Sequence, residues 1–281
     1  KGGVRVVSLA AWNFFWTAFS ALFGAIVGSF LNVCIYRIPL EKSVVRPRSH
    51  CPQCGTQIAW YDNVPVLSWL LLRGHCRHCQ GRISPRYALV EALTAALFAA
   101  VWSRYGWDPR TPVYWLVVSG LLLGSFVDLD HLIIPDRVTL GGMAAGLVLS
   151  AALPVLHDAA SWLEGLSAAV IGLAAGAGAL GLIAELGRRA FKKEAMGLGD
   201  VKLLGAVGAF LGWRAVLFTL VVSSFVGSFV GVYLIVRKGR EWQTRIPYGP
   251  YLALAAVLWL LGGDGWWRAY LNFIAGPPAV P

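Results

Sequence analysis

Long, continuous apolar segments occupy most of this 281-residue chain and constrain its fold more than any other feature. About 20 helical residues cross the hydrocarbon core of a bilayer, and continuous apolar runs differ from the alternating pattern of barrel strands. The mean hydropathy of +0.64 also excludes an ordinary soluble domain. The sequence therefore predicts an all-α polytopic membrane protein with about eight transmembrane helices, over residues 8–36, 87–105, 112–130, 137–156, 161–186, 200–213, 213–236 and 248–263.

The predicted helices divide the chain into three parts. Residues 1–38 are expected to form the first transmembrane helix, residues 39–86 a polar loop, and residues 87–281 a multi-helix membrane core. The sixth apolar segment is too short to cross a bilayer comfortably. Gly212 and Trp213 are therefore interpreted as a tight turn into the seventh helix, with a re-entrant helix as the alternative.

The basic residues predict how the helices are oriented. Most of the 24 Lys and Arg residues fall in the loops after the first, third, fifth and seventh helices. Because Lys- and Arg-rich loops stay on the cytoplasmic side, these loops are predicted to face the cytoplasm and both termini to face outward. The same bias explains the formal charge of +10. The expected surroundings are the lipid bilayer of an inner-type membrane, and no nucleic-acid partner is expected.

Two Cys-x-x-Cys pairs lie in the polar loop, which is expected to be cytoplasmic: Cys51 with Cys54, and Cys76 with Cys79. A separation of about 20 residues between such pairs is typical of a tetrahedral zinc site, and four thiolates leave no open position for water. The sequence therefore predicts a structural Zn²⁺. Disulfides are less favoured in a reducing compartment, and free or redox-active thiols are a third interpretation. Nearby histidines are expected to be surface residues, with zinc ligation as the alternative: His50, His75 and His78.

Glycines are expected to shape this loop. Gly55 and Gly81 follow the two cysteine pairs, where the chain must turn sharply. A fifth cysteine, Cys34, lies alone in the first apolar segment, and its expected role is that of a small buried residue.

Two acidic motifs adjoin apolar helices, where an ionisable side chain costs roughly 2.5–3.5 kcal/mol on insertion scales. One motif spans residues 127–136, and the other spans residues 196–202. The predicted topology places both at the cytoplasmic edge of the membrane. In the second motif, Gly197 and Gly199 precede Asp200 and permit close backbone approach, which favours a helix start packed against another helix.

Asp128 and Asp200 are the candidate catalytic pair. Asp128 and Asp130 point about 200° apart on a helix, so only one of them can face Asp200. Asp128 lies deeper in the apolar run, whereas Asp130, the reserve candidate, and Asp136 flank a proline-containing turn and are expected to be more hydrated. Two carboxylates that share one proton can activate water and protonate a scissile carbonyl. A metal site that includes His131 is the alternative.

With these motifs in place, further segments of the chain resemble the type IV prepilin peptidases, the bifunctional leader peptidase/N-methyltransferase enzymes of type IV pilus and type II secretion systems. The resemblance covers nearly the whole chain. Besides the cysteine pairs and the acidic motifs, it includes residues 28–33 with Arg37 and Pro39, residues 63–65, residues 86–91 and residues 246–251. Ala88 departs from the pattern, since many relatives have proline there.

The resemblance implies an aspartic membrane endopeptidase whose catalytic residues match Asp128 and Asp200. It implies that the leader of a prepilin or pseudopilin is cut at the cytoplasmic face, and that the new N-terminal amine is methylated with S-adenosylmethionine. Methylation is linked in the family to the cysteine loop, including the position of Gly74. The residues that bind this cofactor are unknown from the sequence, which has no Gly-x-Gly-x-x-Gly loop between a strand and a helix.

Two other classes of function fit parts of the sequence. A transporter or channel would use the acidic residues as a proton relay, with the zinc loop as a regulatory cap. Internal symmetry is common in transporters, and this sequence shows no repeat. An assembly scaffold would bind pilin-like helices without cleaving them.

Other polar and small residues in the predicted helices have expected structural roles. Asn32 and Glu91 are expected to hydrogen-bond between helices, with Arg37 or Arg86 as partners of Glu91 and substrate binding as the alternative. Glycines of the fifth helix are expected to allow close packing with a neighbouring helix: Gly172, Gly176 and Gly178.

Overall fold

A computed structural model describes residues 9–192, 196–238 and 246–275 of the protein. Most of the described residues are helical, and they contain no β-strand apart from two isolated bridges, which confirms the all-α prediction. The α-helices are α1 (Leu9–Arg37), α2 (Leu67–Leu71), α3 (Pro85–Tyr105), α4 (Arg110–His131), α5 (Asp136–Ala152), α6 (Trp162–Phe191), α7 (Leu198–Lys238), α8 (Gly249–Leu258) and α9 (Asp264–Ala275). Short helical turns are η1 (Trp60–Asn63), η2 (Pro154–His157) and η3 (Trp259–Gly263).

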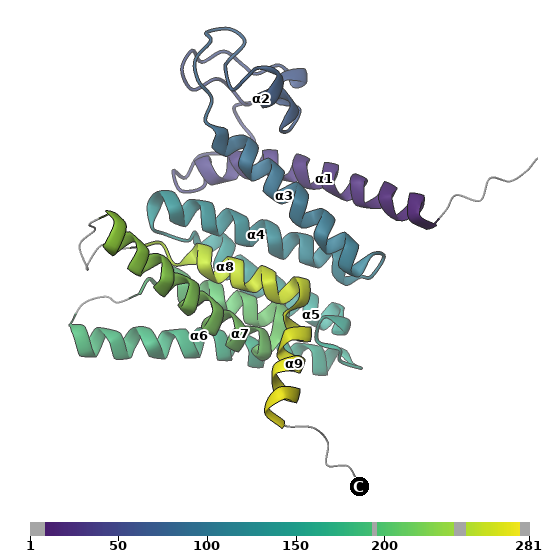
Figure 1. The fold of residues 1–281 in the computed structure, drawn as a ribbon, viewed down its shortest axis with the longest axis vertical. Coiled ribbons are helices and arrows are strands. Elements are labelled where there is room, and N and C mark those ends of the chain that lie inside the picture. The colour runs from purple at the N-terminus through teal and green to yellow at the C-terminus, as the bar shows by residue number, and fades with distance from the viewer. Residues whose placement is uncertain (1–8, 193–195, 239–245, 276–281) are drawn as a thin grey trace, which may run out of the picture. The chain divides into compact units, whose positions relative to one another are not determined.

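The chain divides into two compact units, residues 1–119 and residues 120–281, with the boundary inside α4. In the first unit, α1 packs against α3 (Figure 1). A Cβ atom at Gly24 would lie 2.8 Å from Cβ of Phe98, and one at Gly28 would lie 2.8 Å from Cα of Glu91. Glycine at these two positions of α1 therefore permits the close approach of the two helices.

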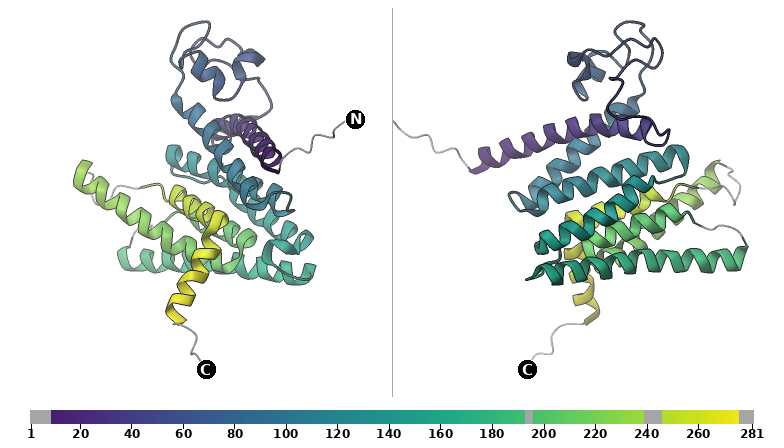
Figure 2. Two further views of the ribbon diagram at one scale, coloured as in Figure 1. Left: turned by 45° about the vertical axis from the view of Figure 1, so that its right-hand side comes forward. Right: turned by 180° about the vertical axis from the view of Figure 1, so that it is seen from behind.

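The polar loop of the first unit joins α1 to α3 and lies beyond the ends of both helices (Figure 2). The buried Arg37 at the end of α1 donates hydrogen bonds to the carbonyl oxygens of Ser43 at 3.0 Å and Pro47 at 2.8 Å. The Asn32 side-chain amide donates to the carbonyl of Tyr87 at 3.0 Å. The expected hydrogen bond of Asn32 between helices is confirmed. Arg37 was an expected partner of Glu91, but these two hydrogen bonds join it to the loop backbone.

In the second unit, α7 packs against α5, α6 and α8 (Figures 1 and 2). The 41 residues of α7 do not form one regular helix, because Gly212 has φ 79° and ψ 172°. A positive φ of this size favours glycine. The break lies at the predicted turn between Gly212 and Trp213.

Glycines set the distance between α6 and α7. A Cβ atom at Gly172 would overlap the carbonyl oxygen of Gly208 and lie 3.1 Å from Cα of Gly212, and one at Gly176 would overlap the carbonyl oxygen of Leu204. The expected packing role of these two glycines is confirmed. The expectation for Gly178 is wrong, because a Cβ atom there would meet no heavy atom within 4 Å among the described residues outside its own helix.

An added methyl group is expected to have opposite effects on stability at Gly172, which packs against α7, and at Gly178, which does not. Gly172→Ala is expected to destabilise the protein by about 1–3 kcal/mol, since the backbones of α6 and α7 must separate. Gly178→Ala is expected to be neutral or stabilising by up to about 1 kcal/mol, because alanine favours a helix. Thermal unfolding of both variants in the same detergent measures the difference. Equal melting temperatures would contradict the packing role of Gly172.

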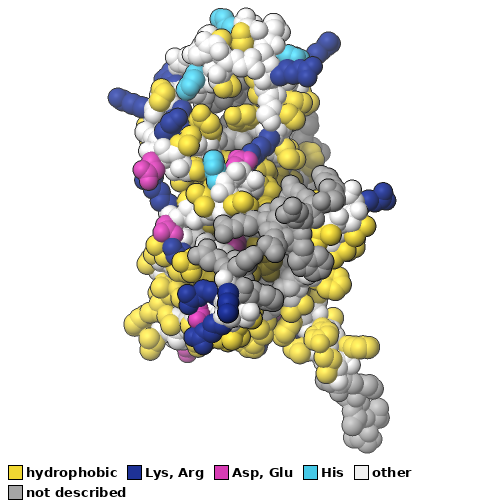
Figure 3. Space-filling view, turned by 90° about the vertical axis from the view of Figure 1, so that its left-hand side faces the viewer, with side chains coloured by type: hydrophobic (Ala, Val, Ile, Leu, Met, Phe, Trp, Pro, Cys, Tyr) yellow, Lys and Arg dark blue, Asp and Glu magenta, His cyan; other side chains and the backbone are white. Residues whose placement is uncertain are grey.

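The protein is a multi-pass membrane protein. Five helical stretches of the described residues are long and apolar enough to cross a membrane: Ala10–Arg37, Pro85–Tyr105, Arg110–His131, Trp162–Ala190 and Leu198–Arg237. With 17 and 10 residues respectively, α5 and α8 are shorter than a full span. The total of eight spans therefore stays a prediction. On the face shown in Figure 3, Lys and Arg side chains lie among hydrophobic ones.

Candidate active site and metal centre

Asp128 and Asp200 lie on different helices of the second unit. Asp128 is in the last turn of α4, and Asp200 is in the first turn of α7. Both residues are buried, with 5% and 9% of their surface exposed. Gly249, which contacts Asp128, and Gly199, which precedes Asp200, both lie against Ile134. The structure therefore brings together the two carboxylates that the sequence analysis selected.

Ile134 joins the three segments that surround these carboxylates. It is buried in the turn between α4 and α5. A Cβ atom at Gly199 would lie 3.1 Å from Cβ of Ile134, and one at Gly249 would lie 3.1 Å from its Cδ1 atom. Glycine at both positions allows the starts of α7 and α8 to approach Ile134. No feature of the sequence singles out Ile134, since an isoleucine beside an apolar helix carries no distinguishing signal.

The two carboxylates have different hydrogen-bond surroundings. Oδ2 of Asp128 accepts a hydrogen bond from the backbone N–H of Gly249 at 2.9 Å. This N–H belongs to the first turn of α8, where amides lack an intrahelical acceptor and the helix dipole favours negative charge. Oδ1 of Asp200 is buried without a hydrogen-bond partner among the described residues. Because buried polar atoms are normally hydrogen-bonded, this oxygen is suited to contact water or substrate.

The other acidic residues of the first motif lie outside this buried pair. Asp130 and Asp136 are exposed, as expected, and so is His131. Lys202 pairs with Asp136, with Nζ and Oδ1 2.6 Å apart. The contrast in burial supports the choice of Asp128 over Asp130 and gives no support to a metal site at His131.

Gly249 offers a test of how closely the Asp128 carboxylate must be positioned. A Cβ atom at this position would lie 2.9 Å from Oδ2 of Asp128, so Gly249→Ala is expected to displace that carboxylate. A misplacement of about 1 Å costs roughly 100-fold in rate when reacting groups must be aligned. Initial rates of peptide cleavage measure the effect. Gly178→Ala is the matched control and should retain activity; equal rates for both variants would contradict the positioning role.

The four loop cysteines converge in the first unit. Their Sγ atoms all lie within 4.8 Å of one another, and the sulfurs of Cys51 and Cys79 are 3.8 Å apart. A tetrahedral zinc ion with Zn–S bonds of about 2.3 Å requires sulfurs separated by about 3.8 Å. All five cysteines of the chain are free thiols, and Cys34 is buried as expected. The cluster therefore fits a metal ion, and the disulfide interpretation is not supported.

The two Cys-x-x-Cys segments share the same backbone hydrogen bond. The N–H of Cys51 donates to the carbonyl of Thr56, and the N–H of Cys76 donates to the carbonyl of Gly81, both at 2.9 Å. Gly55 turns the first half with φ 69°. The expectation for Gly81 is corrected in part, because Gln80 has the positive φ of 57° in the second half. A Cβ atom at Gly81 would overlap the end of the Gln53 side chain, which would have to move.

Hydrogen bonds near the cluster favour the thiolate form of one cysteine, Cys54. Sγ of Cys54 lies 3.3 Å from the hydroxyl of Thr56. Hydrogen bonds from the side chain and backbone of Thr56 lower the pKa of Cys54 to about 6. Since metals bind the thiolate form of cysteine, this position is prepared for a metal ligand at neutral pH.

Two buried aspartates in a multi-pass membrane protein, together with four cysteines that could hold a metal ion, define a class of integral-membrane proteins with the groups for acid–base hydrolysis. Comparison with known families is specific: residues 22–105 match the Bacterial Peptidase A24 N-terminal domain, and residues 115–232 match the Type IV leader peptidase family. The chain belongs to the type IV leader peptidase family.

Curated relatives named prepilin leader peptidase/N-methyltransferase are similar to this chain over most of its length. The Myxococcus xanthus protein is 45% identical over 79% of this chain and 64% of its own length. The Aeromonas hydrophila protein is 40% identical over 94% of this chain and 96% of its own length. The Pseudomonas aeruginosa protein is 35% identical over 90% and 92%, respectively. The comparison with solved structures gave no match.

Proposed function

We propose that this protein is an aspartic endopeptidase that removes the leader peptide of type IV prepilins or pseudopilins, and that it methylates the new N-terminal amine with S-adenosylmethionine. The observation that carries the peptidase activity is the buried pair of Asp128 and Asp200, on two helices that Ile134 holds together. The names of the relatives include both activities. Leader cleavage is assigned to the second unit, which contains both aspartates.

The different surroundings of the aspartates suggest their separate roles. Asp128 accepts the Gly249 N–H and is assigned as the ionised partner, which takes a proton from water as the water oxygen attacks the scissile carbonyl carbon. Asp200 is assigned as the protonated partner, which donates to the carbonyl oxygen. Collapse of the resulting tetrahedral diol breaks the C–N bond. The leaving amine takes the proton that Asp128 accepted from water, and a hydroxyl of the diol returns a proton to Asp200. This sequence of steps needs no covalent enzyme intermediate.

The sulfonium methyl group of S-adenosylmethionine supplies the chemistry for the second reaction. Transfer of that group to the nitrogen of the new N-terminal amine would form a C–N bond and break the C–S bond, with the electron pair left on sulfur and a proton released to solvent. The cysteine cluster, with Zn²⁺ as the proposed ion, is given a structural role, because four thiolates complete the tetrahedral coordination.

The proposed setting is a bacterial inner membrane, with the aspartate pair at the cytoplasmic face. Loops rich in Lys and Arg support this orientation. The leader of a prepilin would reach the aspartates from the cytoplasm, while its apolar segment remained in the lipid bilayer. We also propose that the chain has three functional parts, residues 1–38, 39–86 and 87–281, and that residues 87–281 form the peptidase core.

Purified protein in detergent, incubated with a prepilin, tests both activities in one experiment. Mass spectrometry should show loss of the leader and, when S-adenosylmethionine is added, the mass of one additional methyl group on the mature N-terminus. An intact prepilin after prolonged incubation would refute the peptidase assignment. A cleaved but unmethylated product would refute the methyltransferase assignment alone.

A further inference from the structure

The residue directly before α8, Tyr248, joins the start of that helix to α7. Its hydroxyl oxygen lies 2.8 Å from Oγ of Ser223 and 3.2 Å from Oγ of Ser224, both in α7. Ser223 is buried, and Tyr248 is half-buried. Because its hydroxyl contacts two serines, the tyrosine side chain is held at its tip as well as at the backbone.

The directions of these hydrogen bonds follow from a second contact of Ser223. The Ser223 hydroxyl donates to the carbonyl oxygen of Leu220 at 3.3 Å. A hydroxyl has one proton and two lone pairs, so Ser223 accepts a hydrogen bond from Tyr248. The tyrosine oxygen can in turn accept from Ser224. Loss of the tyrosine hydroxyl would therefore leave a buried serine oxygen without its donor, which is unfavourable.

Two tyrosine rings pack against the same glycine of α7. A Cβ atom at Gly227 would lie 3.3 Å from Cδ2 of Tyr251 and 3.4 Å from Cε2 of Tyr248. The two ring centroids are 6.2 Å apart and the ring planes are 69° apart, which is an edge-to-face arrangement. Among the described residues, the Tyr251 hydroxyl has no hydrogen-bond partner. The two rings therefore share their packing surface, and the hydroxyl contacts with α7 belong to Tyr248.

The backbone after Tyr248 directs one N–H group to Asp128. The N–H of Tyr251 donates to the carbonyl oxygen of Tyr248 at 3.1 Å, and Pro250 has no N–H. The N–H of Gly249 donates to Oδ2 of Asp128 at 2.9 Å. This N–H belongs to the peptide bond between Tyr248 and Gly249. Any displacement of Tyr248 therefore moves the donor itself.

The start of α8 fits closely against the carboxylate that it contacts. A Cβ atom at Gly249 would lie 2.9 Å from Oδ2 of Asp128 and 3.1 Å from Cδ1 of Ile134. Hydrogen bonds of this kind are lost when the donor and acceptor separate beyond about 3.5 Å. A shift of the α8 start by less than about 1 Å would thus be enough to break the contact with Asp128.

We propose that Tyr248 is a positioning residue for leader cleavage. Its hydroxyl, bound to two serines of α7, holds the start of α8 where the Gly249 N–H meets the Asp128 carboxylate. The inference rests on the proposed peptidase function and adds a residue that acts through the backbone of α8 rather than on the reacting atoms. In this arrangement α7 serves both carboxylates, because it carries Asp200 in its first turn and fixes the hydrogen-bond donor of Asp128.

The variant Tyr248→Phe removes the hydroxyl and keeps the ring. With the purified full chain and a prepilin in detergent, kcat for leader cleavage should fall at least about tenfold, since a misplacement of about 1 Å costs roughly 100-fold. KM should change by less than about threefold, because the lost contact positions a catalytic group. Rates are measured well below the melting temperature of each variant, so that loss of folded protein does not contribute.

The matched control for this variant is Tyr251→Phe, which removes a hydroxyl from the neighbouring ring. Its kcat and KM should both stay within about threefold of those of the unchanged protein. An unchanged kcat for Tyr248→Phe, an effect confined to KM, or an equal loss of kcat in both variants would overturn the positioning role.

A double variant tests whether the effect passes through the contact with Asp128. If Tyr248→Phe and Gly249→Ala disturb the same contact, their combination should be less than about threefold slower than Gly249→Ala alone. Losses that multiply would show that Tyr248 acts independently of this contact, and would overturn the proposal.

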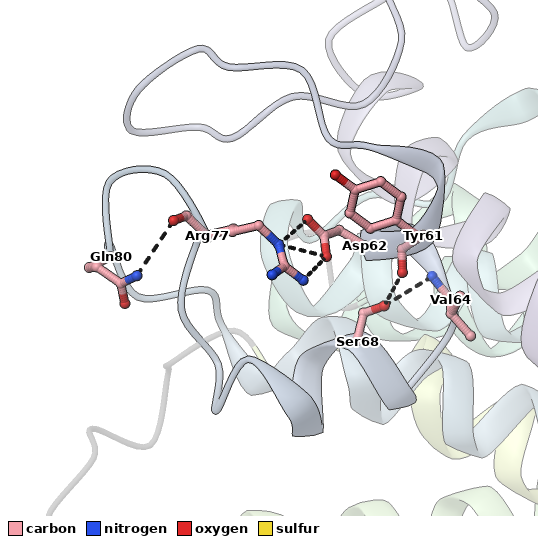
Figure 4. Close-up of polar contacts among 6 residues, drawn as sticks. All are labelled: Tyr61, Asp62, Val64, Ser68, Arg77 and Gln80. Atoms are coloured by element: carbon pink, nitrogen blue, oxygen red, sulfur yellow. Dashed lines mark hydrogen bonds and ion pairs between the residues drawn. The ribbon is translucent and has the colours of Figure 1, made fainter.

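Serine variants test the partners of the tyrosine hydroxyl. Ser223→Ala combined with Ser224→Ala should lower kcat by about the same factor as loss of the tyrosine hydroxyl. Ser68 is the control, because its hydroxyl also accepts one hydrogen bond and donates another, from the N–H of Val64 and to the carbonyl of Tyr61, both at 3.1 Å (Figure 4). It belongs to the first unit, so Ser68→Ala should change kcat for leader cleavage by less than about threefold.

The remaining outcomes separate this inference from the proposed function. A normal kcat in the variant that lacks both α7 serines, or an equal loss in Ser68→Ala, would overturn the positioning role. If the unchanged protein leaves the prepilin intact, the proposed peptidase function is refuted, and the role of Tyr248 with it. Normal cleavage by both the unchanged protein and Tyr248→Phe would overturn the positioning role alone.

Discussion

Replacing Asp128 or Asp200 with asparagine is expected to reduce leader cleavage by at least about 1,000-fold. Positioned acid–base groups contribute roughly 10²–10⁴-fold in rate, and asparagine can neither accept nor donate the transferred proton. Because asparagine has nearly the same shape as aspartate and its oxygen can still accept the Gly249 N–H, Asp128→Asn should remain folded. Initial rates on a purified prepilin, alongside melting temperatures, measure loss of chemistry separately from loss of structure.

Asp130→Asn is the control for this experiment. Asp130 lies on the same helix as Asp128, two residues further along, and is exposed. Its replacement should change the rate by less than about threefold, in contrast to the large effect expected for a catalytic group. A variant of Asp128 or Asp200 that cleaves at the normal rate would contradict the paired-aspartate mechanism. A loss confined to Asp130→Asn and Asp200→Asn would identify Asp130 as the partner.

Removing the metal is expected to unfold the cysteine loop. Structural zinc sites contribute apparent binding energies of about 10–16 kcal/mol in small zinc-binding domains, and this energy is coupled to folding. Protein purified under reducing conditions should contain about one zinc per chain, the stoichiometry of a four-thiolate site. Strong chelation, or Cys51→Ser combined with Cys76→Ser, should remove the metal. Limited proteolysis should then cut within residues 39–86.

Cys34→Ala is the matched control for cysteine replacement, because Cys34 is buried in α1 outside the cluster. This variant should keep its metal and the protease resistance of the loop. Metal-free protein with an equally resistant loop would contradict a structural metal. If chelation abolishes methyl transfer and leaves leader cleavage, the two activities depend on different units.

The apolar segments and the cysteine spacing predicted much of the fold because both are local signals. Each long apolar run corresponds to a helix or part of a helix. The break at Gly212 lies at the end of the sixth apolar segment, where a turn was predicted because that segment is too short to cross a bilayer. The spacing of the two Cys-x-x-Cys pairs was enough to predict that the four sulfurs form a cluster. Helical spacing showed that only one of Asp128 and Asp130 can face Asp200, since residues two apart point to different sides of a helix, and the depth of Asp128 in the apolar run favoured that residue.

Several features depend on contacts between residues far apart in the chain. The Gly249 N–H reaches Asp128 across 121 positions of sequence, and no local pattern around either residue specifies that pairing. Gly172 and Gly178 look equivalent in an apolar segment, yet only Gly172 would collide with the backbone of α7. Which glycine is needed depends on which side of α6 meets its neighbour.

The sequence by itself determined the class of protein, the family, and the residue types available for chemistry, because hydropathy, charge and motif spacing are properties of the chain alone. The tertiary structure decided how those residues are surrounded. In the structure, Asp128 and Asp200 are buried beside Ile134, the four cysteine sulfurs lie close together, and Glu91 lines a cavity with aromatic walls. These arrangements arise from packing of distant segments, which determines the distances and burial on which reactivity depends.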